Sequence, residues 1–292
     1  MPINPALKKL RTLMKRPGFF YSLGVWDPYT ARVSEALGIE CVHIGGYQLG
    51  IGNCTSEPLI TLTELAYATR MVSNAVKIPV IVDCGAGYGE PLHVMRTVRE
   101  IEQAGAAGLH IEDQIYPKRV HYHQGIEHTI SREELVTKIK YALAARTDPD
   151  FLIMGRTDAM KTEGFEEGVI RANMMLEAGA DAVQIFPNTL EECRRAPKEI
   201  KGPIFYVNSE GNRFDRPLFT VKEFNEMGYK SSTNPTALLC PVTQEIKRVV
   251  TNIMTHGESL LPKKEMIAWR KECETLIGLD EMYKVEMDTV EK

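Results

Sequence analysis

The sequence predicts a (β/α)8 barrel, and three observations lead to that prediction. Short apolar runs recur along the chain, with enough residues between them for a helix. The intervening segments have the apolar spacing of amphipathic helices, and several of them end at a glycine, the residue that suits a helix C-terminus. Eight such units in 292 residues match the size of this barrel. No GxGxxG follows the first strand, which disfavours an open doubly wound sheet.

The predicted strands are short runs bounded by turn residues, a pattern typical of strands that are covered on both faces. In chain order they are residues 18–25, 41–44, 78–85, 109–111, 150–158, 182–186 and 203–209, followed by a weaker run that ends at Asn234 and Pro235.

The predicted helices between the strands are recognised by their apolar spacing and by their end residues. Pro91 stands where a first helical turn tolerates proline. Ser131 and Glu134 have the three-residue spacing of a capping box. The clearest helical segments are residues 63–76, 91–105, 131–146 and 165–179.

The chain continues beyond Pro235 with more helical sequence than one barrel needs. We therefore predict a barrel domain over residues 1–255 and a helical tail over residues 256–292. The tail is interpreted as an oligomerisation element. A tail that packs on its own barrel is the alternative.

Composition excludes several classes of function. The net charge is -4, which gives no electrostatic reason to bind nucleic acid or an anionic membrane. No apolar run approaches the ~18 residues that a membrane span requires. The six cysteines are scattered without a CxxC pair, which favours free thiols in a reducing cytoplasm. The basic N-terminal segment lacks the apolar core of a secretory signal, while a mitochondrial transit peptide stays open.

Ionisable side chains follow three consecutive predicted strands. Asp83 ends the third strand, Glu112 ends the fourth and Arg156 ends the fifth. In such a barrel the carboxyl ends of the strands form the active site. Carboxylates on adjacent strands suit a hard divalent cation such as Mg²⁺. An arginine beside them offers a planar fork to a carboxylate or phosphate. The sequence therefore predicts a metal site with a small anionic ligand.

Four segments resemble the isocitrate lyase/phosphoenolpyruvate mutase superfamily, particularly its short members such as 2-methylisocitrate lyase, 2,3-dimethylmalate lyase and carboxyphosphonoenolpyruvate mutase. Their order and spacing also match over residues 19–251. The segments are VDCGAGYGE (82–90), HIEDQIYPKR (110–119), GRTDA (155–159) and YVNSEG (206–211).

The resemblance implies an activity and an assembly. It implies a carbon–carbon lyase that cleaves a small branched 2-hydroxy dicarboxylate, methylisocitrate- or dimethylmalate-like, through an enolate held on Mg²⁺, with Mn²⁺ as a substitute. It also implies that the extra C-terminal helix is exchanged between subunits of a homotetramer, which we expect in the cytoplasm.

The resemblance also assigns residues to roles. Asp83 and Glu112 align with the carboxylates around the metal, Lys118 with the lysine of a mobile gating loop, and Arg156 with the substrate-binding arginine. The candidate substrate-binding residues are Gly45, Gly46 and Tyr47, which align with a loop whose backbone holds the substrate carboxylate, and Asn208 and Glu210 at the end of the seventh strand.

Four family positions differ in this chain. The second aspartate of the Asp-x-Asp metal motif is Gly85. The glutamate that many lyases present after the sixth strand aligns near Phe186 and Pro187. An aspartate expected after the second strand aligns near Ser56 or Glu57, with a short gap. The fourth position is that of a proton-transferring cysteine.

Val120 occupies the cysteine position, and valine cannot transfer a proton. We expect His121, Tyr122 or His123 to replace it as the catalytic acid. A reaction without an enzymic proton donor is the alternative: oxaloacetate decarboxylation, or phosphonopyruvate-type P–C hydrolysis or mutation. A barrel that binds a small carboxylate without turnover is the non-catalytic alternative.

Overall fold

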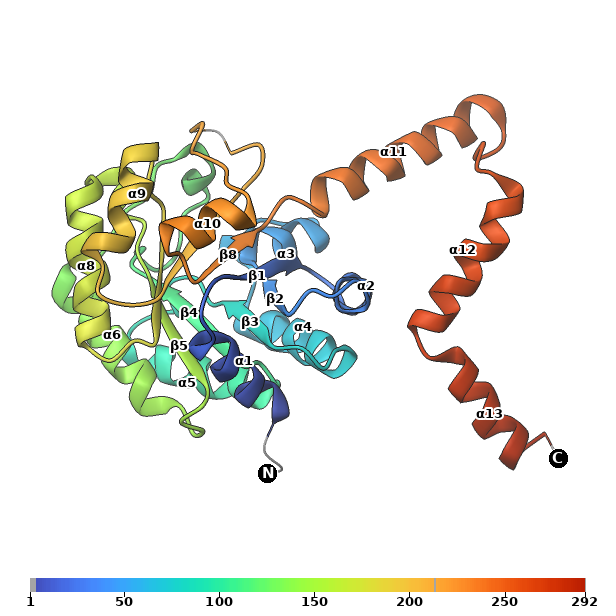
Figure 1. Cartoon of the computed structure of the whole chain (residues 1–292), viewed down its shortest axis with the longest axis horizontal. Coiled ribbons are helices and arrows are strands. Elements are labelled where there is room, and N and C mark those ends of the chain that lie inside the picture. Colours follow the sequence, from blue (N-terminus) through green and yellow to red (C-terminus); the bar gives the residue numbers. More distant parts are fainter. Residues whose placement is uncertain (1–3, 213, 292) are drawn as a thin grey trace. The chain divides into compact units, whose positions relative to one another are not determined.

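A computed structural model of the chain describes residues 4–212 and 214–291. Eight parallel strands close into a barrel in which each strand pairs with the next in the sequence and the last pairs with the first (Figure 1). The predicted (β/α)8 fold is thereby confirmed. The strands are β1 Phe20–Val25, β2 Cys41–Ile44, β3 Val80–Asp83, β4 Gly108–Glu112, β5 Leu152–Arg156, β6 Ala182–Ile185, β7 Ile204–Val207 and β8 Ser231–Asn234.

Helices surround the barrel and include the four predicted from apolar spacing, which are α4, α5, α6 and α8. In chain order the helices are α1 Pro5–Lys15, α2 Pro28–Ala36, α3 Gly46–Gly52, α4 Leu62–Ala75, α5 Pro91–Gln103, α6 Arg132–Ala145, α7 Ala159–Thr162, α8 Phe165–Glu177, α9 Leu190–Glu199, α10 Val221–Met227, α11 Leu239–His256, α12 Lys263–Leu276 and α13 Leu279–Thr289, with the 3-10 turns η1 Glu57–Leu59 and η2 Val120–Gln124.

The helix starts are set by local sequence signals. The Ser131 side chain accepts a hydrogen bond from the backbone of Glu134, and the Glu134 side chain bonds back to the backbone of Ser131, which is the predicted capping box of α6. Thr61 and Glu64 form the same arrangement at α4. Pro91 opens α5 as expected. These reciprocal bonds satisfy backbone donors that the helix itself leaves unpaired.

The strands are buried on both faces, and their register brings charged residues together. Every residue of β4 and β5 is buried. Asp83 on β3 is paired in register with His110 on β4, and Glu112 on β4 with Arg156 on β5. Because paired residues of parallel strands lie side by side, the ends of β3, β4 and β5 place their ionisable groups at one mouth of the barrel.

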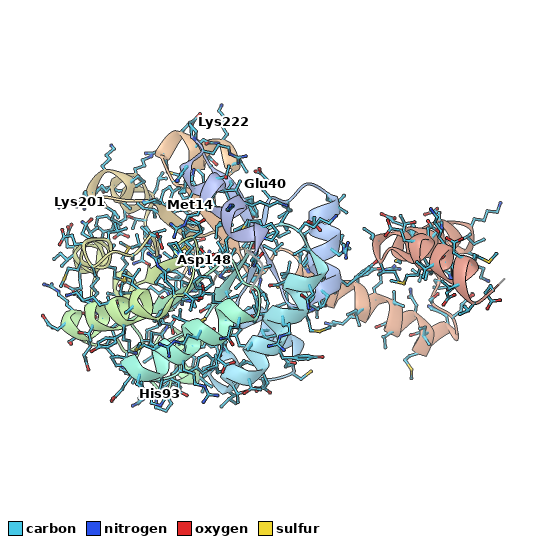
Figure 2. All side chains as sticks on the ribbon, turned by 90° about the horizontal axis from the view of Figure 1, so that it is seen from below. Met14, Glu40, His93, Asp148, Lys201 and Lys222 are labelled. Carbon is cyan, nitrogen blue, oxygen red and sulfur yellow. The ribbon has the colours of Figure 1, made fainter. Side chains whose placement is uncertain are left out.

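The outer layer of the barrel exposes charged side chains to solvent. The labelled lysines Lys201 and Lys222 project outward from it (Figure 2), and their side chains are 74% and 84% exposed. The inner side of this layer packs on the strands through an apolar cluster that includes Leu135, Ile139 and Phe224. This layer fixes the strands that carry the site.

The chain divides into two compact units, the first ending at Ala237 and the second beginning at Leu238. The second unit therefore contains α11, which the sequence analysis counted with the barrel. Its helices carry exposed apolar side chains, among them Met254 at 80% and Ile267 at 76%. None of the helices in the described ranges is long and apolar enough to cross a membrane. A role for this unit in oligomerisation stays a prediction.

Candidate active site

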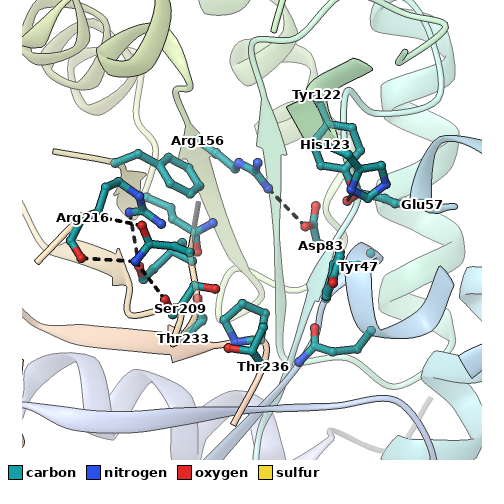
Figure 3. A pocket seen from close by; sticks show the side chains of 18 of the residues that line it. Tyr47, Glu57, Asp83, Tyr122, His123, Arg156, Ser209, Arg216, Thr233 and Thr236 are labelled. Atoms are coloured by element: carbon teal, nitrogen blue, oxygen red, sulfur yellow. Dashed lines mark hydrogen bonds and ion pairs between the residues drawn. The ribbon is translucent and has the colours of Figure 1, made fainter. Parts of the chain in front are cut away.

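A cavity of about 230 Å³ opens at the carboxyl ends of the strands. It is smaller than the ~300–1,000 Å³ pockets that hold drug-sized ligands, so it suits a small molecule. Figure 3 shows its wall, with Asp83, Glu57 and Tyr122 on one side and Arg216, Ser209 and Thr233 on the other. Of the predicted site residues, the cavity is lined by Gly45, Gly46, Tyr47, Asp83, Tyr122, His123 and Arg156.

Three carboxylates meet beside this cavity. Asp83 ends β3, Glu112 ends β4 and Glu57 begins η1, and each offers an oxygen within 4.8 Å of the others. The sequence predicts the first two as metal ligands and predicts that the acid of the loop after β2 is missing. That expectation is corrected here, because Glu57 reaches the group from this loop. A sequence signal existed, since the family's aspartate aligned near Ser56 or Glu57.

Gly85, the position of the absent second aspartate, faces the same group. A Cβ atom placed on Gly85 would lie 3.9 Å from an oxygen of Glu57 and from one of Glu112. The φ of Gly85 is +50°, a backbone conformation that L-residues other than Asn and Asp rarely adopt. A side chain at this position would therefore point toward the carboxylates, and Glu57 is the third acid that this chain provides.

Two buried cations neutralise the carboxylates. The Lys118 ammonium contacts Glu57 and lies 2.8 Å from Oε1 of Glu112. The Arg156 guanidinium lies 3.2 Å from Asp83, 3.2 Å from Glu112 and 3.1 Å from Asp158. Burial alone would lower the pKa of Lys118, but Glu112 and Glu57 outweigh burial and raise it. Lys118 is therefore charged, and it lines a smaller cavity of about 40 Å³ that shares Glu57 and Asp83.

The acids of the group respond differently to the same surroundings. Burial raises the pKa of Glu112 to about 7, against the opposing charges of Arg156 and Lys118. Burial would also raise the pKa of Asp83, but His110, Arg156 and Lys118 outweigh it and hold this pKa well below its usual range. The His110 Nδ1 atom lies 3.6 Å from Asp83. Asp83 is therefore ionised at neutral pH, and Glu112 is more readily protonated than Asp83.

The donor set fits a hard divalent cation. Within the described chain, both carboxylate oxygens of Glu112 are buried and accept no hydrogen bond, although cations lie nearby. Their charge is compensated by ion pairs, from Lys118 at 2.8 Å and from Arg156 at 3.2 Å. Divalent cations such as Mg²⁺ bind one or two protein carboxylates and complete their shell with water. Glu57, Asp83 and Glu112 can together hold such an ion.

The loop that carries the three candidate proton donors folds as η2 and closes one side of the cavity. The Tyr122 hydroxyl donates a hydrogen bond of 2.8 Å to Glu57, and the His123 Nε2 atom lies 2.8 Å from the Ser56 hydroxyl. His121 is exposed and does not line the cavity. Val120 is 48% exposed, so the cysteine position also faces away from it. The structure therefore brings two of the three candidate proton donors to the site.

The loop after β7 contributes different residues from those predicted. The Asn208 amide bonds to the backbone of Phe219 as donor and as acceptor, and therefore holds the loop. Glu210 is exposed and accepts a bond of 3.3 Å from Asn234. Neither Asn208 nor Glu210 lines the cavity. The loop residues that do are Ser209, Gly211, Asn212, Phe214 and Arg216, which are not among the predicted substrate-binding residues.

The fold and the site define a (β/α)8 barrel with a small cavity beside three carboxylates that could hold a metal ion. Residues 10–254 match the sequence profile of the phosphoenolpyruvate phosphomutase family. The chain belongs to this family and hence to the PEP mutase/isocitrate lyase superfamily.

The relatives match over almost their whole length. The chain is 38% identical to 2-methylisocitrate lyase of Aeropyrum pernix, covering 97% of this chain and 91% of that protein. It is 34% identical to 2,3-dimethylmalate lyase of Eubacterium barkeri, covering 95% and 96%. Among solved structures, oxaloacetate acetylhydrolase in complex with 3,3-difluorooxalacetate superposes with a TM-score of 0.89 at 27% identity, covering 98% and 97%.

Proposed function

We propose that this protein is a Mg²⁺-dependent lyase that cleaves a carbon–carbon bond of a small branched 2-hydroxy dicarboxylate, giving a 2-oxo acid and a carboxylate. The observation that carries this proposal is the group of Glu57, Asp83 and Glu112 beside a small cavity that Arg156 lines. Relatives named as lyases at 38% and 34% identity support a carbon–carbon lyase of this superfamily. The branched side group of the substrate is also part of the proposal.

The three carboxylates would hold the metal, with Mn²⁺ as a substitute for Mg²⁺. A bound cation acts as a Lewis acid that accepts negative charge developing on the substrate's oxygens. Asp83 is suited to this role because its pKa is held low by His110, Arg156 and Lys118 against the effect of burial. Lys118 and Arg156 fix the carboxylates in place and limit their mutual repulsion.

The substrate carboxylate would bind at the loop that begins α3. Gly45, Gly46 and Tyr47 line the cavity there, and Arg156 lines it from β5. Arg156 is held by ion pairs to Asp83, Glu112 and Asp158, and its buried Nε has no partner among the residues described. An arginine fixed in this way presents its charge to a ligand without the entropy cost of ordering a free side chain.

Tyr122 is the residue we assign as proton donor. Cleavage turns the substrate hydroxyl into the carbonyl of the 2-oxo acid, with its proton passed to solvent. The electron pair of the broken carbon–carbon bond stays on the α carbon of the other product acid, and that carbon must take up a proton. Burial and the charge of Glu57 raise the pKa of Tyr122, so its hydroxyl keeps its proton at neutral pH. A carbanion is a far stronger base than a phenolate and can take this proton. The Tyr122 ring packs 4.1 Å from the His123 ring, which holds it over the cavity.

The proposal is tested by measuring pyruvate release with Mg²⁺ from branched malates, methylisocitrate, oxaloacetate and phosphonopyruvate. We expect turnover of a branched 2-hydroxy acid, which chelation by EDTA abolishes reversibly. Asp83→Ala should remove turnover while circular dichroism shows an intact fold. Turnover that persists in excess EDTA would contradict the metal-dependent mechanism, and silence across the panel would contradict the lyase.

A reaction without an enzymic proton donor is the second candidate, because Val120 replaces the cysteine and is 48% exposed. Oxaloacetate decarboxylation and phosphonopyruvate-type P–C cleavage belong to this class. Tyr122→Phe separates the two candidates. It should lower lyase turnover by roughly 10²-fold, the usual effect of losing a positioned acid, and leave decarboxylation unchanged. His121→Ala is the control, since His121 lies outside the cavity.

One argument for the non-catalytic alternative, a barrel that binds a small carboxylate without turnover, no longer holds. It rested on the missing groups at Gly85 and Val120, and Glu57 supplies a third carboxylate. We further propose a cytoplasmic homotetramer. All six cysteines are free, as suits a reducing compartment, and the second unit exposes apolar side chains that a partner subunit would cover. Sedimentation velocity tests the assembly, and a monomer at micromolar concentration would refute it.

A further inference from the structure

Glu127 is a buried acid of the cavity with one carboxylate oxygen unused. It is 7% exposed and lines the cavity, but it lies outside the group of three carboxylates. Its Oε1 atom accepts a hydrogen bond of 3.0 Å from Lys161. Its Oε2 atom is buried and has no hydrogen-bond partner in the part of the chain that the structure describes. Because a buried acceptor without a donor is costly, Oε2 is an acceptor for a donor on a ligand.

A second unused acceptor lines the same cavity. Gln184 on β6 is 2% exposed, and its Oε1 atom is buried without a hydrogen-bond partner among the described residues. Lys161 links the two places, because its Nζ atom bonds to Glu127 and lies 3.8 Å from the centre of the Phe186 ring, two residues beyond Gln184. The cavity therefore offers two buried acceptors to a ligand that carries a hydrogen-bond donor.

The position of Glu127 is fixed by its neighbours on both sides of the ion pair. The segment that follows it forms an antiparallel bridge between Gln114 and Thr129. Lys161 is held in turn by Asp158, at 2.8 Å. Because the carboxylate is already ordered, a ligand that bonds to Oε2 does not bear the entropy cost of ordering this side chain.

The local charges favour a neutral donor over a cationic one. Lys161 pairs with Glu127 at 3.0 Å and with Asp158 at 2.8 Å, and Asp158 also pairs with Arg156 at 3.1 Å. The two acids are thus balanced by two cations. An ammonium group of a ligand would lose its hydration without meeting an unpaired negative charge, whereas a hydroxyl group loses much less on entering the cavity. The donor that fits Oε2 is therefore a hydroxyl group.

We propose that Glu127 determines specificity by accepting a hydrogen bond from a hydroxyl group on the branch of the substrate. The substrate is accordingly a small acid with a second hydroxyl group besides the 2-hydroxyl group that is cleaved to a carbonyl. A site built to bond a hydroxyl group rejects an analogue that lacks it, because the buried acceptor then stays unpaired. A methyl branch would leave Oε2 in that state. This inference rests on the proposed function, because it names the branch of the same substrate.

The experiment compares ligands that share the malate skeleton and differ only at the branch, as isomers of matching configuration. Tartrate carries a hydroxyl group at the branch, and 3-methylmalate carries a methyl group of similar size. Calorimetric titration of the full chain in Mg²⁺ should show at least about tenfold tighter binding of tartrate, as expected for a hydrogen bond to a charged acceptor. 3-Hydroxyaspartate, which has an ammonium group at the branch, should bind more weakly than tartrate. Where the ligands are cleaved, the ratio of kcat/KM values replaces the ratio of dissociation constants.

Two variants of Glu127 and one control test the assignment. Glu127→Met removes the acceptor and should reduce the preference for tartrate by about tenfold or more. Glu127→Gln keeps a neutral acceptor, so it should retain part of the preference but lower it by about threefold or more. Glu167→Met is the matched control, because Glu167 is also largely buried and paired, with Arg171 at 2.8 Å, but lies outside the cavity. It should leave the preference within about twofold of wild type. Thermal unfolding checks that each variant folds, and Glu127→Gln carries the test if Glu127→Met does not fold.

Three results overturn the inference: no preference of the wild-type protein for tartrate over 3-methylmalate, a preference that survives the loss of Glu127, and tighter binding of 3-hydroxyaspartate than of tartrate. The first two would make Glu127 a structural partner of Lys161 whose Oε2 atom is bonded by water. Release of glyoxylate or pyruvate reports separately on the proposed function. A preference that depends on Glu127 without cleavage of any branched acid refutes the reaction and keeps the inference. Cleavage of a branched acid without that preference refutes the inference and keeps the reaction.

Discussion

Replacing Glu57 by glutamine removes one negative charge from the proposed metal site and leaves the size of the side chain unchanged. Glutamine still offers a carbonyl oxygen to the Tyr122 hydroxyl, which bonds to Glu57 at 2.8 Å. The ion pair with Lys118 is lost, but Lys118 keeps Glu112 at 2.8 Å. The substitution therefore isolates the charge of Glu57 from its packing.

The expected loss of Mg²⁺ affinity follows from the charges present. A divalent cation attracts a carboxylate about 4 Å away with roughly 8 kcal/mol at an effective dielectric constant of about 20, before any compensation. Lys118 contacts the same carboxylate and cancels much of this attraction. Even residues that only support the ligands of a metal change its affinity by about 10- to 100-fold, which sets a lower limit for Glu57. We expect a loss of at least that size, about 1.4–2.8 kcal/mol.

Calorimetric titration with Mg²⁺, or a Mn²⁺ titration followed by electron paramagnetic resonance, measures the affinity. Glu127→Gln is the matched control, because Glu127 is 7% exposed, lines the same cavity and pairs with Lys161 at 3.0 Å, outside the three-carboxylate group. Unchanged affinity in Glu57→Gln would refute the assignment of Glu57. An equal loss in Glu127→Gln would show that only the total charge of the cavity matters.

Three further predictions follow from the same geometry. Gly85→Asp adds a fourth acid near Glu57, so we expect a lower melting temperature in EDTA and tighter Mg²⁺ binding; unchanged binding in calorimetry would mean that the position does not face the metal. Arg156→Lys replaces a planar fork by a point charge, so the Michaelis constant should rise strongly, and an unchanged constant would make Arg156 structural. Burial lowers the pKa of His43 to about 3 and that of His110 to about 4, from 6.5. Between pH 6.5 and about 4 the unfolded chain therefore binds more protons at these positions, and their contribution to stability falls as the pH falls. His43→Gln should flatten the acid side of the stability profile by up to about 1.4 kcal/mol per pH unit, as measured by urea unfolding; identical slopes would contradict the buried neutral state.

The sequence determined the barrel and the core of its site. Alternating apolar runs and helical spacings depend on local periodicity, which can be read along the chain. Once eight parallel strands are known, their carboxyl ends must meet at one mouth. Asp83, Glu112 and Arg156 could therefore be placed together before any coordinates, because each directly ends a strand. The capping box of Ser131 could also be predicted, because it depends only on residues three positions apart.

The other site residues lie in loops, and the conformation of a loop is determined by its tertiary contacts. Glu57 is held by Lys118 and Tyr122, which lie 61 and 65 residues further along the chain. Its place beside Asp83 and Glu112 therefore depends on the folding of two separate loops against each other. Asn208 directly follows a strand, but its amide forms hydrogen bonds with the backbone of Phe219, 11 residues away. Arg216 reaches the cavity from the same loop without any motif to mark it. Periodicity carries no information about these side chains, because the direction of each is set by a partner that is distant in sequence and near in space.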